Sequence, residues 1–186
     1  MPHSYLIAEL EPEDLSGKVD REKYGLPASG FVFCSFNNSY KIEPSGFSIW
    51  MRILKQVPGS VLWLAGQSGG ALLEQNLRKE ATRCGVDDSR LIFAGFLSRN
   101  EHLKRHQVAD LFLDSFVYNA AATSSLALQL GLPVITCPGD TFASRVGGSL
   151  LKSAGLPECI AKDPSDYERL AVKLANDPSL LQSYRN

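Results

Sequence analysis

The fold is decided by residues 31–41, which read Phe31-Val32-Phe33-Cys34-Ser35-Phe36-Asn37-Asn38-Ser39-Tyr40-Lys41. An apolar, β-branched and aromatic run that ends in small polar residues is typical of a buried parallel strand opening into a ligand crevice. Lys41 then lies at the carboxyl end of this strand, where open α/β sheets bind ligands and where an ammonium group suits a phosphate. Lysines are mostly exposed, so the position is equally compatible with a solvated polar turn.

Around this stretch, strand patterns alternate with helix patterns. Short apolar runs predict strands at 31–36, 60–65, 91–94, 109–114 and 133–137. Helices are predicted near 45–57, 69–84, 99–107, 122–131, 141–154 and 164–176, several of them from apolar residues at three- and four-residue spacing. Alternation of this kind gives right-handed crossovers and a parallel sheet covered on both faces. The sequence therefore predicts an α/β fold with a doubly wound, Rossmann-like parallel sheet.

Length and composition favour a single domain. The chain has 186 residues, of which 44% are hydrophobic and 21% charged. Residues 1–28 are polar and predict a lead-in with a short helical turn near 20–27, before a domain at 29–186.

The formal net charge of −1 argues against nucleic acid as a partner. No stretch approaches the ~20 apolar residues of a membrane span, and the amino terminus lacks a signal-peptide pattern. The four cysteines show no CxxC pair and no metal-ligand spacing, so we expect a reduced, cytoplasmic protein without a metal site.

Two loops carry candidate binding residues. Ser98 and Glu101 have the spacing of a capping box, which places Arg99 and His102 one turn apart at a helix start. The His102 imidazole suits contact with a nucleobase, and Arg99 suits contact with a ribose or a phosphate. A solvated, capped helix start is the alternative explanation of both residues. Farther on, Thr123 and Ser124 bring hydroxyl groups to a helix amino terminus that follows a strand ending at Asp114. Free N–H groups there favour a diphosphate, although ordinary helix capping explains these residues equally well.

The remaining loops are less informative. Residues 66–70 are rich in glycine but lack the spacing of a phosphate-binding loop, so we interpret them as a connection. After the last predicted strand, Asp140 or Thr141 is expected to cap the next helix, with Arg145 one turn inside it. Arg145 then faces either the crevice or solvent. No Ser/His/Asp set and no metal-ligand cluster forms a self-contained active site.

Five ordered blocks resemble the O-GlcNAc transferase family, glycosyltransferase family 41, over roughly residues 20–185: 36–42, 57–64, 109–114, 131–134 and 138–146. The resemblance implies the C-terminal lobe of a two-lobed GT-B enzyme. That lobe binds UDP-N-acetylglucosamine without a metal or other cofactor, and the enzyme transfers the sugar to Ser or Thr of an acceptor protein. It also implies that an N-terminal lobe and tetratricopeptide repeats belong to the parent chain, and that this lobe alone is inactive.

The resemblance also assigns roles to residues. It places Lys41 on the diphosphate as the catalytic residue, with Asn38 beside it, and puts Arg99 and His102 around the uridine. The family's Asn-Ala/Gly-His-Thr-Thr motif and its ribose-binding Asp align with the segment from Asn119 to Leu126, where Asn119 and Thr123 match and Ala121, Ala122 and Leu126 depart. Three functions stay open: an active donor lobe, a degenerate nucleotide-binding or scaffolding module, and a transferase that uses another donor such as UDP-glucose or GDP-fucose.

Overall fold

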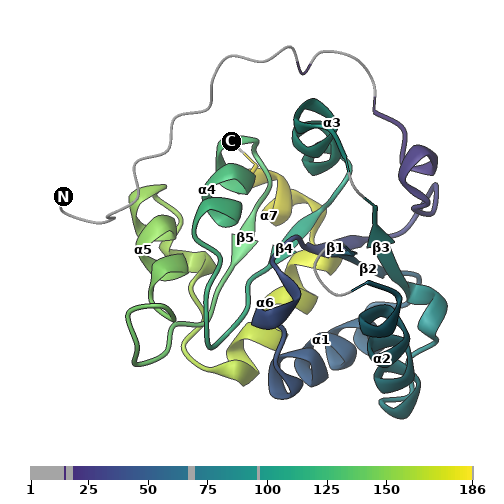
Figure 1. Cartoon of the computed structure of the whole chain (residues 1–186). Helices are drawn as coiled ribbons and strands as arrows, with labels where there is room; N and C mark the ends of the chain where they lie inside the picture. The colour runs from purple at the N-terminus through teal and green to yellow at the C-terminus, as the bar shows by residue number, and fades with distance from the viewer. Residues whose placement is uncertain (1–14, 16–18, 67–69, 96, 186) are drawn as a thin grey trace.

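The computed structural model describes residues 15, 19–66, 70–95 and 97–185, and its centre is a five-stranded parallel sheet (Figure 1). The strand order is β3-β2-β1-β4-β5. The strands are β1 (Val32–Ser35), β2 (Val61–Ala65), β3 (Leu91–Ala94), β4 (Leu111–Leu113) and β5 (Val134–Ile135). All pairings are parallel, with Phe33 opposite Leu62 of β2 and Leu111 of β4. The prediction of a doubly wound α/β sheet is confirmed.

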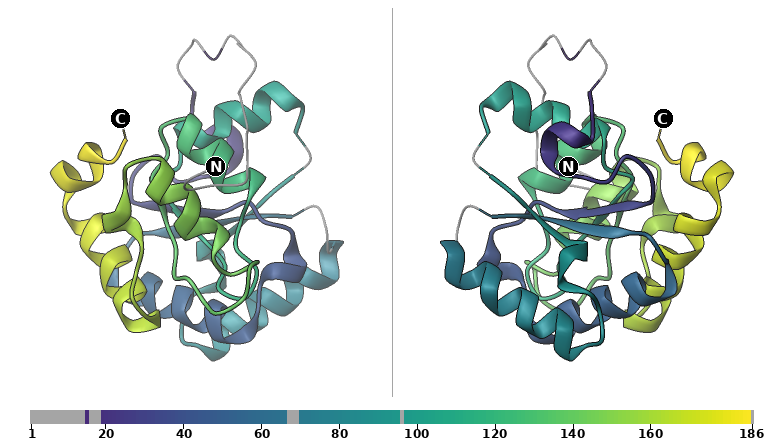
Figure 2. Two further views of the ribbon diagram at one scale, coloured as in Figure 1. Left: turned by 90° about the vertical axis from the view of Figure 1, so that its left-hand side faces the viewer. Right: turned by 90° about the vertical axis from the view of Figure 1, so that its right-hand side faces the viewer.

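Helices cover both faces of this sheet (Figure 2). The α-helices are α1 (Pro44–Gln56), α2 (Gly70–Arg83), α3 (Arg99–Lys104), α4 (Ala122–Gln129), α5 (Val146–Ser153), α6 (Pro164–Asn176) and α7 (Pro178–Ser183). Short 3-10 turns are η1 (Glu22–Tyr24), η2 (Ser39–Lys41), η3 (Asp88–Arg90), η4 (Arg105–Gln107) and η5 (Pro157–Cys159). In Figure 2, α1 and α2 lie below the sheet, and η1 and α3 lie above it.

The central strand β1 explains why the opening stretch of sequence is so apolar. β1 has a neighbour on each side and helices on each face, so Val32, Phe33 and Cys34 have no exposed surface. Beyond β1, the Phe36 ring packs edge-on against the Trp63 ring, with 5.0 Å between their centres. A strand enclosed on all sides reads as a continuous apolar run rather than as an alternating one.

The order of the strands places the switch point of the sheet between β1 and β4. From β1 the chain crosses through α1 to β2, and from β4 it crosses through α4 to β5, which lies on the opposite side. The connections that leave the two neighbouring strands therefore diverge at their carboxyl ends. In open α/β sheets this switch point is where ligands bind.

The described part of the lead-in packs against the sheet domain. Arg21 forms a salt bridge with Asp110 at 2.7 Å, and the Tyr24 hydroxyl donates to the Glu101 carboxylate at 3.0 Å. Leu26 is buried in the core, and η1 confirms the predicted helical turn. Residues 1–14 and 16–18 of the lead-in, and 67–69 of the glycine-rich connection, lie outside the described residues, and the boundary at residue 28 stays a prediction.

The predicted helix at 141–154 is wrong at its start, because α5 begins only at Val146. Residues 141–144 instead form a turn, in which the Thr141 N–H donates to Ser144 Oγ at 3.1 Å and the Ser144 N–H donates to Thr141 Oγ1 at 3.2 Å. Neither Asp140 nor Thr141 caps the helix. Arg145 occupies the N-cap position, is exposed and makes no side-chain capping bond. The sequence reading also missed α7, whose first turn is capped by Asp177.

No helix in the described ranges combines the length and the apolar character that crossing a bilayer requires.

Candidate functional site

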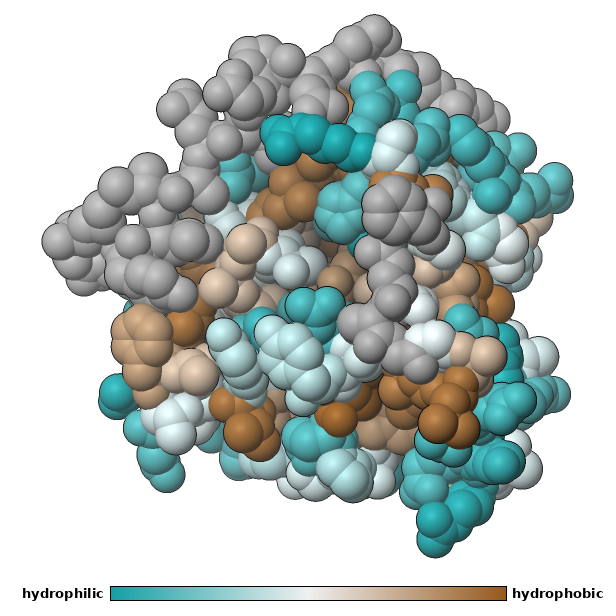
Figure 3. Space-filling view, viewed as in Figure 1, coloured by the Kyte–Doolittle hydropathy of each residue, from teal (hydrophilic) through white to brown (hydrophobic). Residues whose placement is uncertain are grey.

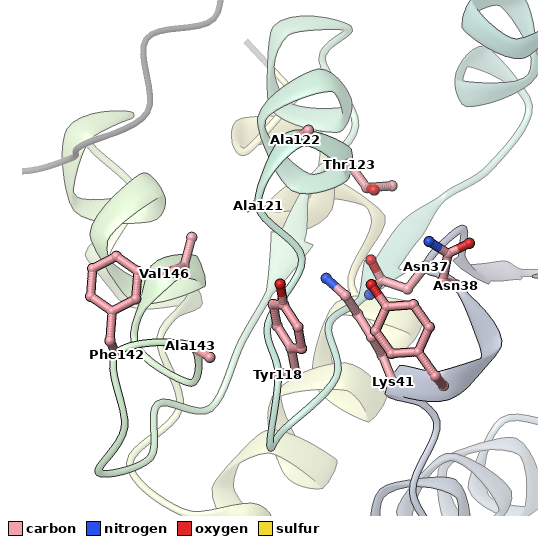
Figure 4. Close-up of a pocket in the computed structure, with 11 residues that line it drawn as sticks. Asn37, Asn38, Lys41, Tyr118, Ala121, Ala122, Thr123, Phe142, Ala143 and Val146 are labelled. Carbon is pink, nitrogen blue, oxygen red and sulfur yellow. The ribbon is translucent and has the colours of Figure 1, made fainter.

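A cavity of about 280 Å³ opens at the carboxyl ends of β1 and β4, at the switch point of the sheet (Figure 4). Three segments form its walls: the chain after β1, the loop from β4 into α4, and the loop from β5 into α5. The lining residues are Asn37, Asn38, Tyr40, Lys41, Tyr118, Ala121, Ala122, Thr123, Phe142, Ala143 and Val146.

Lys41 is the cation of this cavity. It ends the turn η2 and is half-buried, and its Nζ donates to the Asn119 carbonyl oxygen at 2.9 Å. The same Nζ lies 4.0 Å from the centre of the Tyr118 ring. Burial lowers the pKa of Lys41, and the negative charge of Asp114 opposes this shift. The side chain is thus held at two points beside the cavity.

Asp114 organises the loop that faces Lys41. Its buried carboxylate accepts hydrogen bonds from the Ser115 N–H at 2.8 Å, the Ala120 N–H at 2.7 Å and the Thr136 hydroxyl at 2.7 Å. Burial raises the pKa of Asp114 to about 7, although these three donors act in the opposite direction. A Cβ on Gly147 would lie 2.4 Å from Asp114 Oδ2, so only glycine lets α5 approach this carboxylate.

Asn119 ties two loops together. Its side-chain Nδ2 donates to the Ser115 carbonyl oxygen at 2.6 Å, and its Oδ1 accepts from the Gly147 N–H at 3.2 Å. Its own N–H donates to the Ala143 carbonyl oxygen at 2.9 Å. Both ends of the carboxamide are therefore used inside the protein, and Asn119 meets the cavity through its carbonyl contact with Lys41. Its predicted role in ligand binding stays a prediction.

The start of α4 forms the wall next to Lys41 and Tyr118. Ala121 is its N-cap residue and makes no side-chain capping bond. The first N–H groups of a helix have no partner within the helix, so those of α4 are available to a ligand in the cavity. Thr123 lines the cavity, whereas Ser124 is buried and its hydroxyl has no hydrogen-bond partner among the described residues. Asn38, Lys41 and Thr123 are thus brought together, and Ser124 lies behind them.

Arg99 and His102 lie outside this cavity, on α3. Ser98 caps the helix by accepting from the Glu101 N–H, as the capping box predicts. Arg99 is exposed, while His102 is half-buried with its ring centre 5.3 Å from that of His106. Burial, and then the positive charge of Arg105, lower the pKa of His102 to about 4. The imidazole is neutral at neutral pH, and its contact with a ligand stays a prediction.

The sequence reading missed the aromatic residues of the cavity, which are Tyr40, Tyr118 and Phe142. The exposed large hydrophobic residues of the described chain are these three, Val117, and Leu72 in the first turn of α2. All five residues lie in segments that follow the carboxyl end of a strand. An apolar side chain in such a segment was therefore the sequence signal that could have identified the aromatic residues of the cavity. In the view of Figure 1, the space-filling picture shows brown hydrophobic patches among hydrophilic residues (Figure 3).

Within the described ranges, no group of three or more His, Cys, Asp or Glu residues is arranged to hold a metal ion.

Comparison with known proteins gives a consistent family. Residues 9–186 match the profile of Glycosyl transferase family 41. The chain is 39% identical over 167 residues to the UDP-N-acetylglucosamine–peptide N-acetylglucosaminyltransferase of Caenorhabditis elegans, an alignment that covers 90% of this chain and 14% of that protein. It is 36% identical to the probable enzyme SEC of Arabidopsis thaliana, over 97% of this chain and 19% of that protein.

Solved structures agree. A mutant of the Thermobaculum terrenum O-GlcNAc transferase superposes with a TM-score of 0.80 at 30% identity, covering 84% of this chain and 30% of that one. The glycosyltransferase WaaG shares the fold, with a TM-score of 0.66 at 18% identity over 89% of this chain and 43% of that one. The chain therefore spans only a small part of the curated relatives that it matches.

Proposed function

The chain belongs to glycosyltransferase family 41, and on that premise we propose that it is the donor-binding lobe of a protein O-GlcNAc transferase-like enzyme. The donor is UDP-N-acetylglucosamine, and the parent enzyme transfers the sugar to Ser or Thr hydroxyls of a protein. One observation carries the proposal: the Lys41 ammonium and the uncapped start of α4 border the same cavity at the switch point of the sheet. Both favour an anion, and a diphosphate has enough oxygens to contact both.

In the proposed reaction, the acceptor hydroxyl oxygen forms a bond to the anomeric carbon while the bond from that carbon to the diphosphate breaks. The electron pair of the broken bond leaves with UDP, so negative charge grows on the diphosphate. Lys41 and the α4 N–H groups stabilise that charge, and they do so most strongly in the transition state. These groups supply the positive potential at the leaving group, which supports a metal-independent reaction.

The acceptor hydroxyl must also lose a proton. Among the described residues that line the cavity, none carries a carboxylate or an imidazole. We therefore assign the general base, which accepts this proton, to another part of the parent protein. The exposed apolar side chains at the same edge of the sheet support this, because they provide a surface for the N-terminal lobe.

Recognition of the uracil ring of the donor is assigned to α3. A neutral His102 can lie flat against uracil, and the exposed Arg99 can reach the ribose or a phosphate. The parent protein is proposed to carry tetratricopeptide repeats and to act on proteins in the cytoplasm. The four free cysteines suit such a reducing compartment.

The proposal is tested by calorimetric titration of this chain with UDP, UDP-N-acetylglucosamine, GDP and GDP-fucose. We expect micromolar-to-millimolar binding of the two uridine compounds and weaker binding of the two guanosine compounds. Tighter binding of the guanosine compounds would assign a different donor. Failure of a folded sample to bind any of the four would contradict donor binding by this lobe and favour a scaffolding module.

A further inference from the structure

Tyr118 makes an unusual contact with Lys41. The Lys41 ammonium lies over the ring face, 4.0 Å from its centre, and in the close-up both side chains point into the same space (Figure 4). Tyr118 is 46% exposed, so its ring is not a core side chain that happens to touch a lysine. The aromatic ring of Tyr40 lies beyond it, with 6.1 Å between the two ring centres.

The backbone is fixed at the Tyr118 carbonyl group and at the next residue. The Tyr118 carbonyl oxygen accepts from the Ser115 hydroxyl at 2.7 Å, and the Ser115 hydroxyl oxygen in turn accepts from Asn37 Nδ2 at 3.1 Å. The next residue, Asn119, is held by its side chain and its N–H, and its carbonyl oxygen accepts from Lys41. The loop therefore presents a ring face and a carbonyl to the same ammonium group.

The chemistry of these two partners differs from that of a salt bridge. In the described part of the chain Lys41 forms no ion pair, so no carboxylate in contact with it neutralises its charge. A ring face attracts a cation through its quadrupole and carries no net charge. It can hold the ammonium in place without competing for it when an anionic diphosphate arrives. An ammonium has three N–H donors, and the Asn119 carbonyl uses one of them.

We infer that Tyr118 is a positioning residue for Lys41: its ring face holds the ammonium group at the cavity wall, with its charge still available to an anionic ligand. That the ligand is the diphosphate of a nucleotide sugar rests on the proposed function. The contact itself does not.

The test compares two apolar substitutions, of which only one keeps the aromatic ring. Tyr118→Phe keeps the ring face and removes the hydroxyl, whereas Tyr118→Leu keeps an apolar side chain and removes the ring. The first readout needs no ligand: the pKa of Lys41, followed by NMR of 13C-methylated lysines and assigned with Lys41→Arg. We expect the Leu variant to lower the pKa of Lys41, because the charged form loses its ring contact, and the Phe variant to leave it unchanged.

The second readout is the dissociation constant of UDP. Loss of a cation–π contact is expected to weaken binding about 2- to 30-fold in Tyr118→Leu, with Tyr118→Phe within about twofold of the wild type. A Leu variant with the wild-type Lys41 pKa and the wild-type UDP affinity would overturn the inference. If UDP binds none of the proteins, the proposed function fails, and the Lys41 pKa of the two variants alone decides the role of Tyr118.

Discussion

The helix that follows β1 and the helix that follows β4 start at the same edge of the sheet, but their first N–H groups have different partners. In α1, the Glu43 carboxylate accepts from the Ser45 N–H at 2.8 Å and from the Gly46 N–H at 2.6 Å, and Pro44 occupies the first helical position. In α4, Ala121 offers no side-chain cap and the start of the helix borders the cavity. The protein completes the start of α1 with its own carboxylate, whereas the start of α4 has no side-chain cap and is the proposed anion site.

The two starts also differ in what holds them. The cap of α1 is local, because the Glu43 carboxylate binds the N–H groups of residues only two and three positions farther along the chain. The start of α4 is held from a distance, through the buried Asp114 carboxylate, Thr136 next to β5 and the close approach of Gly147 in α5. Damage to this non-local support should therefore cost more stability than loss of the local cap.

The largest effect is expected from Gly147→Ala. The new Cβ would lie 2.4 Å from Asp114 Oδ2 and 2.6 Å from Thr136 Oγ1, so α5 or the loop must move. We expect the free energy of unfolding, measured in urea, to fall by about 2–3 kcal/mol or more. Gly148→Ala is the matched control, because the atoms nearest to its Cβ lie 3.9 Å away and alanine favours a helix. Equal losses of unfolding free energy in both variants would contradict the close approach of α5 to Asp114.

Asp114 gives a prediction for pH. Its pKa is raised to about 7 in the folded protein, so between about pH 4 and pH 7 the folded state keeps a proton that the unfolded state has lost. The stabilising contribution is complete below about pH 4 and is lost as the pH rises through 7, with a slope approaching about 1.4 kcal/mol per unit.

This contribution is isolated by Asp114→Asn, which keeps a side-chain oxygen for the loop N–H groups. Urea unfolding of both proteins from pH 5 to pH 8 should show the variant gaining stability relative to the wild type as the pH rises. A difference that is constant across this range would mean that Asp114 does not titrate there.

Ala122→Asp tests whether the open helix start is an anion site. Ala122 is exposed in the first turn of α4 and lines the cavity. A carboxylate there should stabilise the helix by about 0.3–1 kcal/mol through its dipole. It should also weaken UDP binding by about tenfold or more, because it repels the diphosphate. Ala122→Asn, similar in size but neutral, is the control, and equal weakening by both variants would point to steric blocking instead.

Glu43→Ala should have the smallest effect on UDP binding and should lower only the stability of the fold. Removal of the α1 cap is expected to cost about 1 kcal/mol of stability. Because Glu43 does not line the cavity, UDP affinity should stay at the wild-type value. A large loss of UDP binding in this variant would show that the two helix starts are not independent.

Local pattern was sufficient to predict much of the fold. The continuous apolar run of β1 predicts an enclosed strand, and the three- and four-residue spacing of Phe47, Trp50 and Leu54 predicts a buried helix face. The side chains of both elements are buried. The start of α5 was missed because Thr141 and Ser144 bond to each other's backbone and side chain, and this competes with helix formation.

The candidate site was predicted only in part. Lys41, Asn38 and Thr123 lie in the cavity because each follows a strand or begins a helix, which sequence can reveal. The contact of Tyr118 with Lys41 and the approach of Gly147 to Asp114 join residues far apart in the chain. Such pairs depend on strand order, which the alternating pattern does not specify.

The most direct test of a diphosphate site between Lys41 and α4 is calorimetric titration of UDP into the wild type, Lys41→Ala and Lys173→Ala. Lys173 is an exposed lysine of α6 outside the cavity and serves as the charge-matched control. Loss of a charge-assisted hydrogen bond predicts that UDP binds Lys41→Ala about tenfold to a hundredfold more weakly, with Lys173→Ala unchanged. UDP binding of equal strength in the wild type and Lys41→Ala would contradict the assignment of this site.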